Sequence, residues 1–279
     1  MSAIVDRSWL VWTHPQDLRG QVAIVIGGSS GIGLAVARAL DERGVRVVVA
    51  SRDAARVEQA VRSLDHATGF ANCDTQIPDR VDSLFKFAQG LTGQIDMLIY
   101  SAGIGRGDRT LAAIPRPVAS LDEDEWDAVI DTNLRGAFLA CRAAARIMVA
   151  QGHGQILNIS SARGAVRGQA CGSGYCASKM AVRAMFQAMS EELAPLGVRV
   201  LSLLPDAVDT SLIAGTTLAP RGALDSIDVG RFVAQMLSAP FDTLLDEPVV
   251  APFNTRGRAG GRKQPSTASG ADVNSHATN

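Results

Sequence analysis

A tyrosine and a lysine spaced four residues apart are the side chains best suited to chemistry in this sequence. Tyr175 and Lys179 lie in the segment Tyr175-Cys176-Ala177-Ser178-Lys179, and residues four apart share one face of a helix. A nearby ammonium favours the phenolate and lowers the pKa of a tyrosine below its usual value of about 10. Such a tyrosine can exchange a proton near neutral pH. The same spacing also occurs on solvated surface helices, so a catalytic role needs support from other residues.

A glycine-rich stretch follows the first apolar run of the chain. Its sequence is Ile26-Gly27-Gly28-Ser29-Ser30-Gly31-Ile32-Gly33. Glycines let the backbone turn sharply and approach a pyrophosphate, and the N-terminus of the following helix offers N–H groups and a partial positive charge. The stretch lies between an expected strand and an expected helix, which is the context in which such turns bind dinucleotides. We therefore assign phosphate binding to Gly27, Ser29, Ser30, Gly31, Ile32 and Gly33.

Strand and helix patterns alternate from residue 21 onward. Buried parallel strands are expected at Val22–Ile26, Arg46–Ala50, Met97–Tyr100, Gln155–Ile159 and Val198–Leu204, with weaker ones near Gly69–Cys73 and Pro248–Pro252. Helices are expected between them at Ile32–Arg43, Ala54–Leu64, Asp79–Leu91, Glu123–Ala150, Tyr175–Ala194 and Asp228–Leu237. The alternation predicts an α/β fold of one domain, a Rossmann-like doubly wound parallel sheet with helices on both faces. We place that domain at residues 21–253, after an N-terminal extension (1–20), and expect a disordered tail at 254–279.

The composition argues against several classes of partner. The chain has 279 residues, 47% of them hydrophobic, and a formal net charge of −1, so we expect no nucleic-acid partner. No apolar run approaches the roughly 20 residues of a membrane span, and residues 1–19 lack the pattern of a signal peptide. The four cysteines form no CxxC pair and no metal-ligand spacing. We expect a cytoplasmic protein with reduced thiols and no metal.

Taken together, the motifs resemble those of the short-chain dehydrogenase/reductase family over about residues 21–252. The resemblance rests on the Gly-xxx-Gly-x-Gly turn, on Asn133-Leu134-Arg135-Gly136, on Asn158-Ile159-Ser160-Ser161 and on the Tyr-xxx-Lys pair. It implies that Ser161 orients the substrate oxygen, although Ser160 is an alternative because the gap from Ser161 to Tyr175 is one residue longer than expected. It also implies that Asn133 holds a water in a proton relay to Lys179, and that Lys179 holds the nicotinamide ribose.

Three positions depart from the family pattern. Ile26 replaces the threonine that usually precedes the first glycine of the turn. Tyr100-Ser101-Ala102-Gly103 stands where the family has Asn-Asn-Ala-Gly, and the small Ala102 and Gly103 would let the cofactor ribose pack closely. Pro205-Asp206-Ala207-Val208-Asp209-Thr210 stands where the family has Pro-Gly-x-Val-x-Thr, with Thr210 contacting the nicotinamide carboxamide. Asp206 either caps a short helix starting near Ala207 or faces the nicotinamide ring and favours the oxidised cofactor.

The end of the second strand indicates which cofactor is preferred. Enzymes that bind NAD place a carboxylate there to bind the ribose 2′-hydroxyl, whereas this chain has Ser51 followed by Arg52. A guanidinium can hold a 2′-phosphate through two parallel hydrogen bonds. We interpret Asp53 as the N-cap of the next helix and place Asp74 beside the adenine ring. The sequence thus predicts NADP(H) in preference to NAD(H).

The resemblance implies hydride transfer between a nicotinamide and a carbonyl or alcohol carbon. We expect a carbonyl reductase or alcohol dehydrogenase acting on a small, largely apolar substrate under a lid at Ser211–Pro220. Two alternatives stay open: a lyase or isomerase on the same scaffold, and a non-catalytic nucleotide-binding protein. Small apolar residues on the helices at Glu123–Ala150 and Tyr175–Ala194 permit close approach across a two-fold axis, although they could also simply pack on the sheet. The family resemblance implies a homodimer or homotetramer built on these helices.

Overall fold

The structure is a computed structural model that describes residues 15–105, 117–168, 172–210, 212, 222–243 and 245–252. The first fourteen residues, the expected tail and most of the expected lid at Ser211–Pro220 lie outside these ranges. The expected boundaries of the domain at residues 21 and 253 therefore stay predictions.

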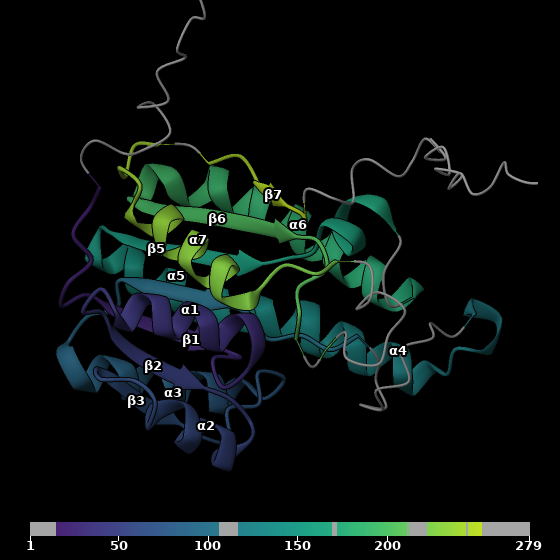
Figure 1. The fold of residues 1–279 in the computed structure, drawn as a ribbon, viewed down its shortest axis with the longest axis horizontal. Coiled ribbons are helices and arrows are strands. Elements are labelled where there is room, and N and C mark those ends of the chain that lie inside the picture. The colour runs from purple at the N-terminus through teal and green to yellow at the C-terminus, as the bar shows by residue number, and fades with distance from the viewer. Residues whose placement is uncertain are drawn as a thin grey trace, which may run out of the picture.

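A parallel sheet of seven strands forms the centre of the described part of the chain (Figure 1). The strands lie in the order β3-β2-β1-β4-β5-β6-β7. The order reverses between β1 and β4, and in open sheets of this kind a ligand binds beyond the carboxyl ends of the strands at that point. The strands are β1 (Val22–Ile26), β2 (Arg46–Ala50), β3 (Ala67–Phe70), β4 (Met97–Tyr100), β5 (Gly154–Ile159), β6 (Val198–Pro205) and β7 (Val249–Val250).

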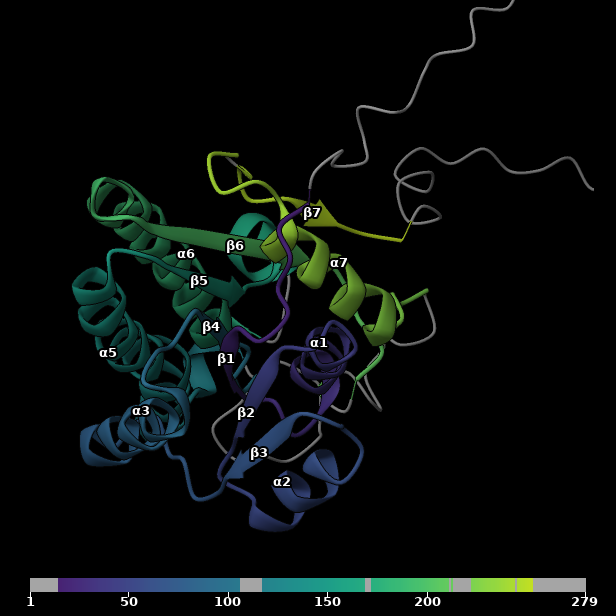
Figure 2. The same cartoon turned by 90° about the vertical axis from the view of Figure 1, so that its left-hand side faces the viewer.

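Helices cover both faces of the sheet (Figure 2). One face carries α1 (Gly31–Asp41), α2 (Ala54–Val61) and α7 (Ser226–Ser238), and the other carries α3 (Pro78–Thr92), α5 (Gly136–Gln151) and α6 (Ser173–Leu193). The helix α4 (Glu123–Ile130) lies beyond the carboxyl ends of the strands (Figure 1). Short turns of helix occur at η2 (Val118–Ser120), η3 (Asp131–Arg135), η4 (Arg163–Arg167) and η5 (Ala194–Leu196). This architecture confirms the predicted fold class.

Alternation along the strands builds one apolar core on each face. Leu98 packs into the core under α3, α5 and α6, whereas its neighbours Met97 and Ile99 pack into the core under α1 and α7. The strands β1, β4, β5 and β6 are buried along their whole length. Parallel strands covered on both faces are expected to be continuously apolar. Most of the predicted strand positions therefore agree with those observed.

Three predicted elements differ from those observed. The expected helix Glu123–Ala150 is interrupted by η3, a π-turn between α4 and α5, and the expected strand Gly69–Cys73 lies earlier, at Ala67–Phe70. The strand ends early because Asn72 adopts a left-handed backbone, with φ of 56°. The short helix expected near Ala207 is absent, since Val208 instead forms a bridge with Leu224.

The described residues include three of the four cysteines. Cys73, Cys141 and Cys176 are free thiols, and burial raises the pKa of Cys73 to about 12. Within the described ranges, no helix is long and apolar enough to cross a membrane, and no group of three or more acidic, histidine or cysteine side chains could hold a metal ion.

Arg199 joins β5, β6 and the end of α7 at the amino-terminal edge of the sheet. Its guanidinium is buried, and the Nη2 atom donates hydrogen bonds to the Gln155 side-chain oxygen at 2.6 Å and to the Leu237 carbonyl oxygen at 3.2 Å. Nη1 donates to the carbonyls of Ala239 and Pro240. A cation at a helix C-terminus satisfies carbonyls that the helix leaves unpaired and interacts favourably with its dipole.

Replacing Arg199 tests how much this network stabilises the fold. We expect Arg199→Met to lower the free energy of unfolding by about 2–4 kcal/mol, because the buried Gln155 side-chain oxygen and several carbonyls lose a charged donor. Arg46→Met removes the same charge from an exposed strand residue and should change stability by less than about 0.5 kcal/mol. Denaturant unfolding of both variants gives the comparison, and equal effects would contradict the assignment.

Candidate active site

The glycine turn brings the end of β1 against the end of β4. Gly27 has a φ of +82°, and a Cβ added there would lie 2.8 Å from the backbone nitrogen of Ala102. A Cβ on Gly33 would lie 2.2 Å from the carbonyl oxygen of Gly27. Any larger side chain at either position would therefore force the backbone of the turn apart.

The start of α1 is open to a ligand. Ser30 occupies the N-cap position of α1, but its side chain makes no capping hydrogen bond. The first N–H groups of a helix otherwise lack intrahelical partners and bind anions well. Thr210 lies close by, since a Cβ on Gly31 would be 3.3 Å from the Thr210 methyl group. The predicted phosphate-binding turn and the residue predicted to contact the carboxamide thus lie side by side.

An open cavity of about 580 Å³ adjoins this turn. Its inner end is formed by Ser29, Ser30, Gly31 and Thr210, four of the residues predicted to bind the cofactor. Arg38 of α1 and Arg56 of α2 also line it. The sequence analysis did not identify either arginine, because their positions on exposed helix faces carry no motif.

The residues after β2 are arranged as the sequence analysis expected. Asp53 caps α2 by accepting a hydrogen bond from the Arg56 backbone N–H at 3.1 Å, and its other oxygen pairs with the Arg56 side chain at 3.3 Å. Arg52 is exposed and makes no ion pair with any described residue. Asp74, after β3, accepts a hydrogen bond from the Gln76 N–H. The carboxylate of Asp53 is therefore engaged by α2, and the guanidinium of Arg52 is available to a ligand.

Asn133 lies in the π-turn η3 and is buried, with 1% of its surface exposed. Its side-chain oxygen accepts from the Ile104 N–H at 2.8 Å, and its amide nitrogen donates to the Ile104 carbonyl and to the Ser178 hydroxyl at 3.0 Å. Asn133 is therefore not a solvated helix residue. Asn133 instead joins the segment after β4 to the helix that carries Tyr175 and Lys179.

Tyr175 and Lys179 are both buried on α6. The Lys179 ammonium lies 5.8 Å from the centre of the Tyr175 ring and 3.4 Å from the Ile159 carbonyl oxygen. A Cβ on Gly103 would lie 3.5 Å from that ammonium and 3.3 Å from the Asn133 side-chain oxygen. Asn133 and Lys179, predicted from two different motifs, therefore meet beside Gly103, just after the carboxyl end of β4.

Ser161 follows β5 and faces the same region. Its hydroxyl oxygen accepts a hydrogen bond from the Gly164 N–H at 3.0 Å, which leaves its own proton available for donation to another oxygen. The hydroxyl of Ser160 is fully buried and has no partner among the described residues. This geometry favours Ser161 over Ser160 as the serine that reaches a substrate.

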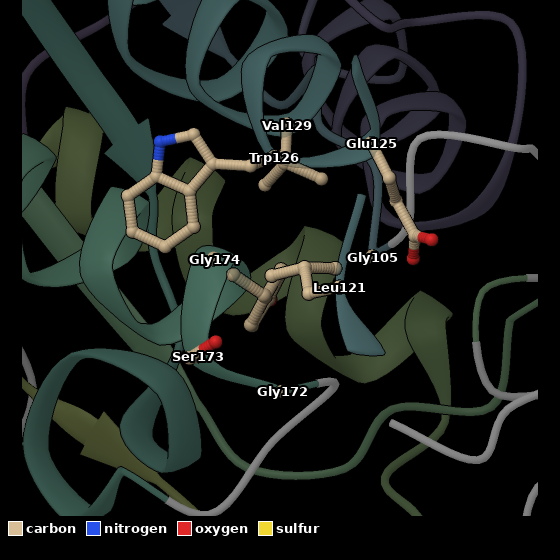
Figure 3. Close-up of a pocket in the computed structure, with 9 residues that line it drawn as sticks. Gly105, Leu121, Glu125, Trp126, Val129, Gly172, Ser173 and Gly174 are labelled. Atoms are coloured by element: carbon tan, nitrogen blue, oxygen red, sulfur yellow. The ribbon is translucent and has the colours of Figure 1, made fainter. Parts of the chain in front are cut away.

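A small cavity beside Tyr175 has an apolar wall (Figure 3). Leu121, Trp126 and Val129 form this wall, and Gly172, Ser173 and Gly174 lie opposite it at the start of α6. The Trp126 ring packs closely on Gly174, where an added Cβ would be 3.3 Å away. The enclosed volume of about 10 Å³ holds a single water at most.

Comparison with known proteins identifies the family of this chain. A family model described as short chain dehydrogenase matches residues 21–219. The chain belongs to the short-chain dehydrogenase/reductase family. An uncharacterized oxidoreductase of Staphylococcus aureus (strain MW2) is 32% identical over 236 residues, which cover 84% of this chain and 98% of the relative. As a member of this family, the protein is a short-chain oxidoreductase.

Solved structures of short-chain dehydrogenases give the same result. A short-chain type dehydrogenase/reductase from Mycobacterium marinum is 29% identical with a TM-score of 0.73, and the match covers 84% of this chain and 95% of that one. A metagenomic short-chain oxidoreductase in complex with NADP is 31% identical with a TM-score of 0.71, with coverages of 85% and 99%.

Tyr100 stands where the short-chain dehydrogenase pattern has an asparagine, and its hydroxyl group connects β4 to η3. Its buried hydroxyl donates to the carbonyl oxygen of Thr132 at 2.9 Å and lies 3.4 Å from the Thr75 hydroxyl. Burial raises the pKa of this phenol far above its ordinary value, so it remains a donor. Tyr100 thus holds the backbone of η3 one residue before Asn133.

Asp206 replaces a glycine of the pattern, and two arginines engage its carboxylate. It caps no helix; instead its carboxylate pairs with Arg163 and, at 3.2 Å, with Arg167, both in η4. It also accepts from the Ala207 N–H at 2.8 Å. Burial opposes its ionisation, but these hydrogen bonds and the two arginine charges hold the pKa of Asp206 below its ordinary value. No local pattern in the sequence indicates this pairing, because the partners are 43 and 39 residues apart.

Proposed function

We propose that this protein is a cytoplasmic, NADP(H)-dependent carbonyl reductase or alcohol dehydrogenase that interconverts a small, largely apolar ketone and its alcohol. The observation that carries the proposal is the convergence of Ser161, Tyr175, Lys179 and Asn133 beside the glycine turn. Leu121, Trp126 and Val129 place apolar side chains next to Tyr175, alongside the carboxylate of Glu125.

The chain has the features that a dinucleotide requires. The close approach at Gly27 and Gly33 leaves backbone where a side chain would otherwise stand, and the start of α1 has no side-chain cap. The Gly turn, Ala102, Gly103 and Thr210 would hold the cofactor along the carboxyl edge of the sheet. When bound, the cofactor supplies hydride transfer to or from C4 of its nicotinamide.

Each catalytic side chain then has a defined task. Ser161 donates a hydrogen bond to the substrate oxygen and orients it, while Tyr175 transfers a proton to that oxygen during reduction or takes one from it during oxidation. Lys179 places a positive charge beside Tyr175 and holds the nicotinamide ribose. Asn133 fixes the segment at Ile104 and the hydroxyl of Ser178, and it positions the relay that returns a proton to Lys179.

A preference for NADP(H) is supported by the residues after β2. Ser51 presents no carboxylate to a 2′-phosphate, Asp53 is occupied by α2, and Arg52 is exposed. Arg56 lines the cavity that begins at Ser29 and Ser30 and adds positive charge nearby. The related metagenomic structure holds NADP.

The first test concerns the proton donor. Tyr175→Phe keeps the ring but removes the proton, so we expect turnover of a ketone panel with NADPH to fall by at least about a hundredfold, with NADPH binding kept. Tyr100→Phe removes the same group from the other tyrosine of the chain, which bonds the backbone beside Asn133 but lies away from the reacting atoms, and should lower turnover by less than about tenfold. Wild-type turnover in Tyr175→Phe would refute the mechanism. Conversion of a substrate without net oxidation or reduction of the nicotinamide would support the lyase or isomerase alternative.

The second test concerns the cofactor. Arg52→Ala removes a guanidinium that can bind the 2′-phosphate, so the KM for NADPH should rise by about 10- to 100-fold while that for NADH stays nearly constant. Arg62→Ala removes the same charge from the far end of α2, where Arg62 pairs with Glu58, and should leave both constants unchanged. A wild type that uses NADH at least as well as NADPH would contradict the assignment.

The third test concerns assembly. We propose a homodimer or homotetramer built on α5 and α6, supported by the exposure of Phe138 and Val149 on α5 and of Met180 on α6. Light scattering should then give about two or four times the chain mass of 29.3 kDa. Phe138→Glu should lower that mass, and Leu91→Glu, on an exposed position of α3, should not. A monomer at micromolar concentration would refute the proposal.

A further inference from the structure

The turn η4 contacts both of the side chains that would act on the substrate. The N–H of Gly164 bonds the Ser161 hydroxyl, and the N–H of Ala165 bonds the Ser161 carbonyl at 2.8 Å. Gly164 also lies flat against Tyr175, since an added Cβ would be 2.7 Å from a ring carbon. A displacement of η4 would therefore disturb the serine and the tyrosine together.

One carboxylate holds both ends of this turn. Arg163 is the first residue of η4 and Arg167 the last, and each pairs with a different oxygen of Asp206. Asp206 directly follows β6, and its backbone N–H donates to the Val250 carbonyl at 2.7 Å. The carboxylate is thus fixed to the rigid sheet, and the two arginines transmit that position to the turn.

The type of interaction suits a positioning role. The Asp206 side chain is 1% exposed, and buried, hydrogen-bonded ion pairs resist rearrangement because a separated charge would lose its partner in a poorly solvated place. A π-turn has weaker internal hydrogen bonding than an α-helix and is often found at functional sites. The two ion pairs of Asp206 with Arg163 and Arg167, called the clamp below, hold η4 from outside and compensate for that weakness.

We propose that Asp206, through Arg163 and Arg167, is a positioning residue that holds η4 so that the Ser161 hydroxyl and the Tyr175 ring stay aligned for reaction. This inference rests on the proposed function for its kinetic consequence. The clamp itself is a property of the fold and can be tested without substrate.

The kinetic test compares Asp206→Asn with a matched control. Asp206→Asn should lower kcat by about 10- to 100-fold, as small misplacements of reacting groups do, with the dissociation constant for NADPH changed by less than about twofold. Asp96 is also buried, and the exposure of the whole residue is 7% for both Asp96 and Asp206. Its carboxylate, however, accepts a hydrogen bond from the Val22 N–H at the amino edge of the sheet. Asp96→Asn should keep the wild-type kcat below its melting temperature, and an equal loss in both variants would refute the proposal.

A double variant tests whether Asp206 acts through Ser161. If it does, the loss of kcat caused by Asp206→Asn should be smaller in the Ser161→Ala background than in the wild type, because the aligned hydroxyl is already missing and only the alignment of Tyr175 can still be lost. Losses that multiply in the double variant would show that Asp206 acts independently of Ser161 and would overturn the proposal. Arg167→Gln removes only the half-exposed arm of the clamp and should lower kcat by a few-fold, which provides a second, milder variant.

Hydrogen exchange of the unliganded protein separates the clamp from the chemistry. Amides of residues 163–168 should exchange at least about tenfold faster in Asp206→Asn and moderately faster in Arg167→Gln, since local opening becomes easier. Amides of α1 should be unchanged, as should those of η4 in Asp96→Asn. Unchanged exchange in η4 of both clamp variants would overturn the inference, whereas a wild type inactive toward all carbonyls would count against the proposed function alone.

Discussion

The side-chain amide of Asn133 forms hydrogen bonds on which the rest of the site depends. Through Ile104 it fixes the segment after β4, and through Ser178 it fixes the helix that carries Tyr175 and Lys179. An amide can donate and accept at once, so a single buried side chain connects two segments that are far apart in the sequence. Loss of this connection would leave buried backbone groups without partners at the point where the strands β4 and β5 present their ends to a ligand.

The backbone of η3 departs from the α-helix to put Asn133 in this place. A π-turn costs helical hydrogen bonding, and it persists where the surrounding structure compensates. Here Tyr100 supplies one bond, to the Thr132 carbonyl, and Gln76 supplies another, to the Thr132 hydroxyl at 2.7 Å. Gly136 follows the turn, and an added Cβ there would lie 2.5 Å from the Thr75 hydroxyl. The substitution of tyrosine for the asparagine of the family pattern is therefore accommodated by a compact polar network.

Local signals in the sequence were sufficient for most of the fold and for the composition of the site. The strands from Val22, Arg46 and Met97 were predicted at their observed bounds, because buried parallel strands are continuous runs of apolar residues bounded by polar ones. The capping role of Asp53 followed from its position before α2. The bonds from Tyr100 to Thr132 and from Asp206 to Arg163 could not be predicted, since they join residues 32 and 43 positions apart. Such contacts form only when folding brings distant segments together, so the local pattern of apolar and polar residues does not indicate them.

The departures from the family pattern are more informative than its conserved elements would be alone. A carboxylate after β6 would be unfavourable in a buried setting without compensation, and in this chain two arginines from η4 provide it. The three charges leave a net charge of +1 beside the serine and tyrosine, with the Arg167 side chain still 44% exposed. A positive field at the point where negative charge develops on a substrate oxygen stabilises that charge, and it does so most strongly where water is excluded. The same ion pairs therefore make a buried carboxylate tolerable at the end of β6 and connect it to the turn whose backbone contacts Ser161 and Tyr175.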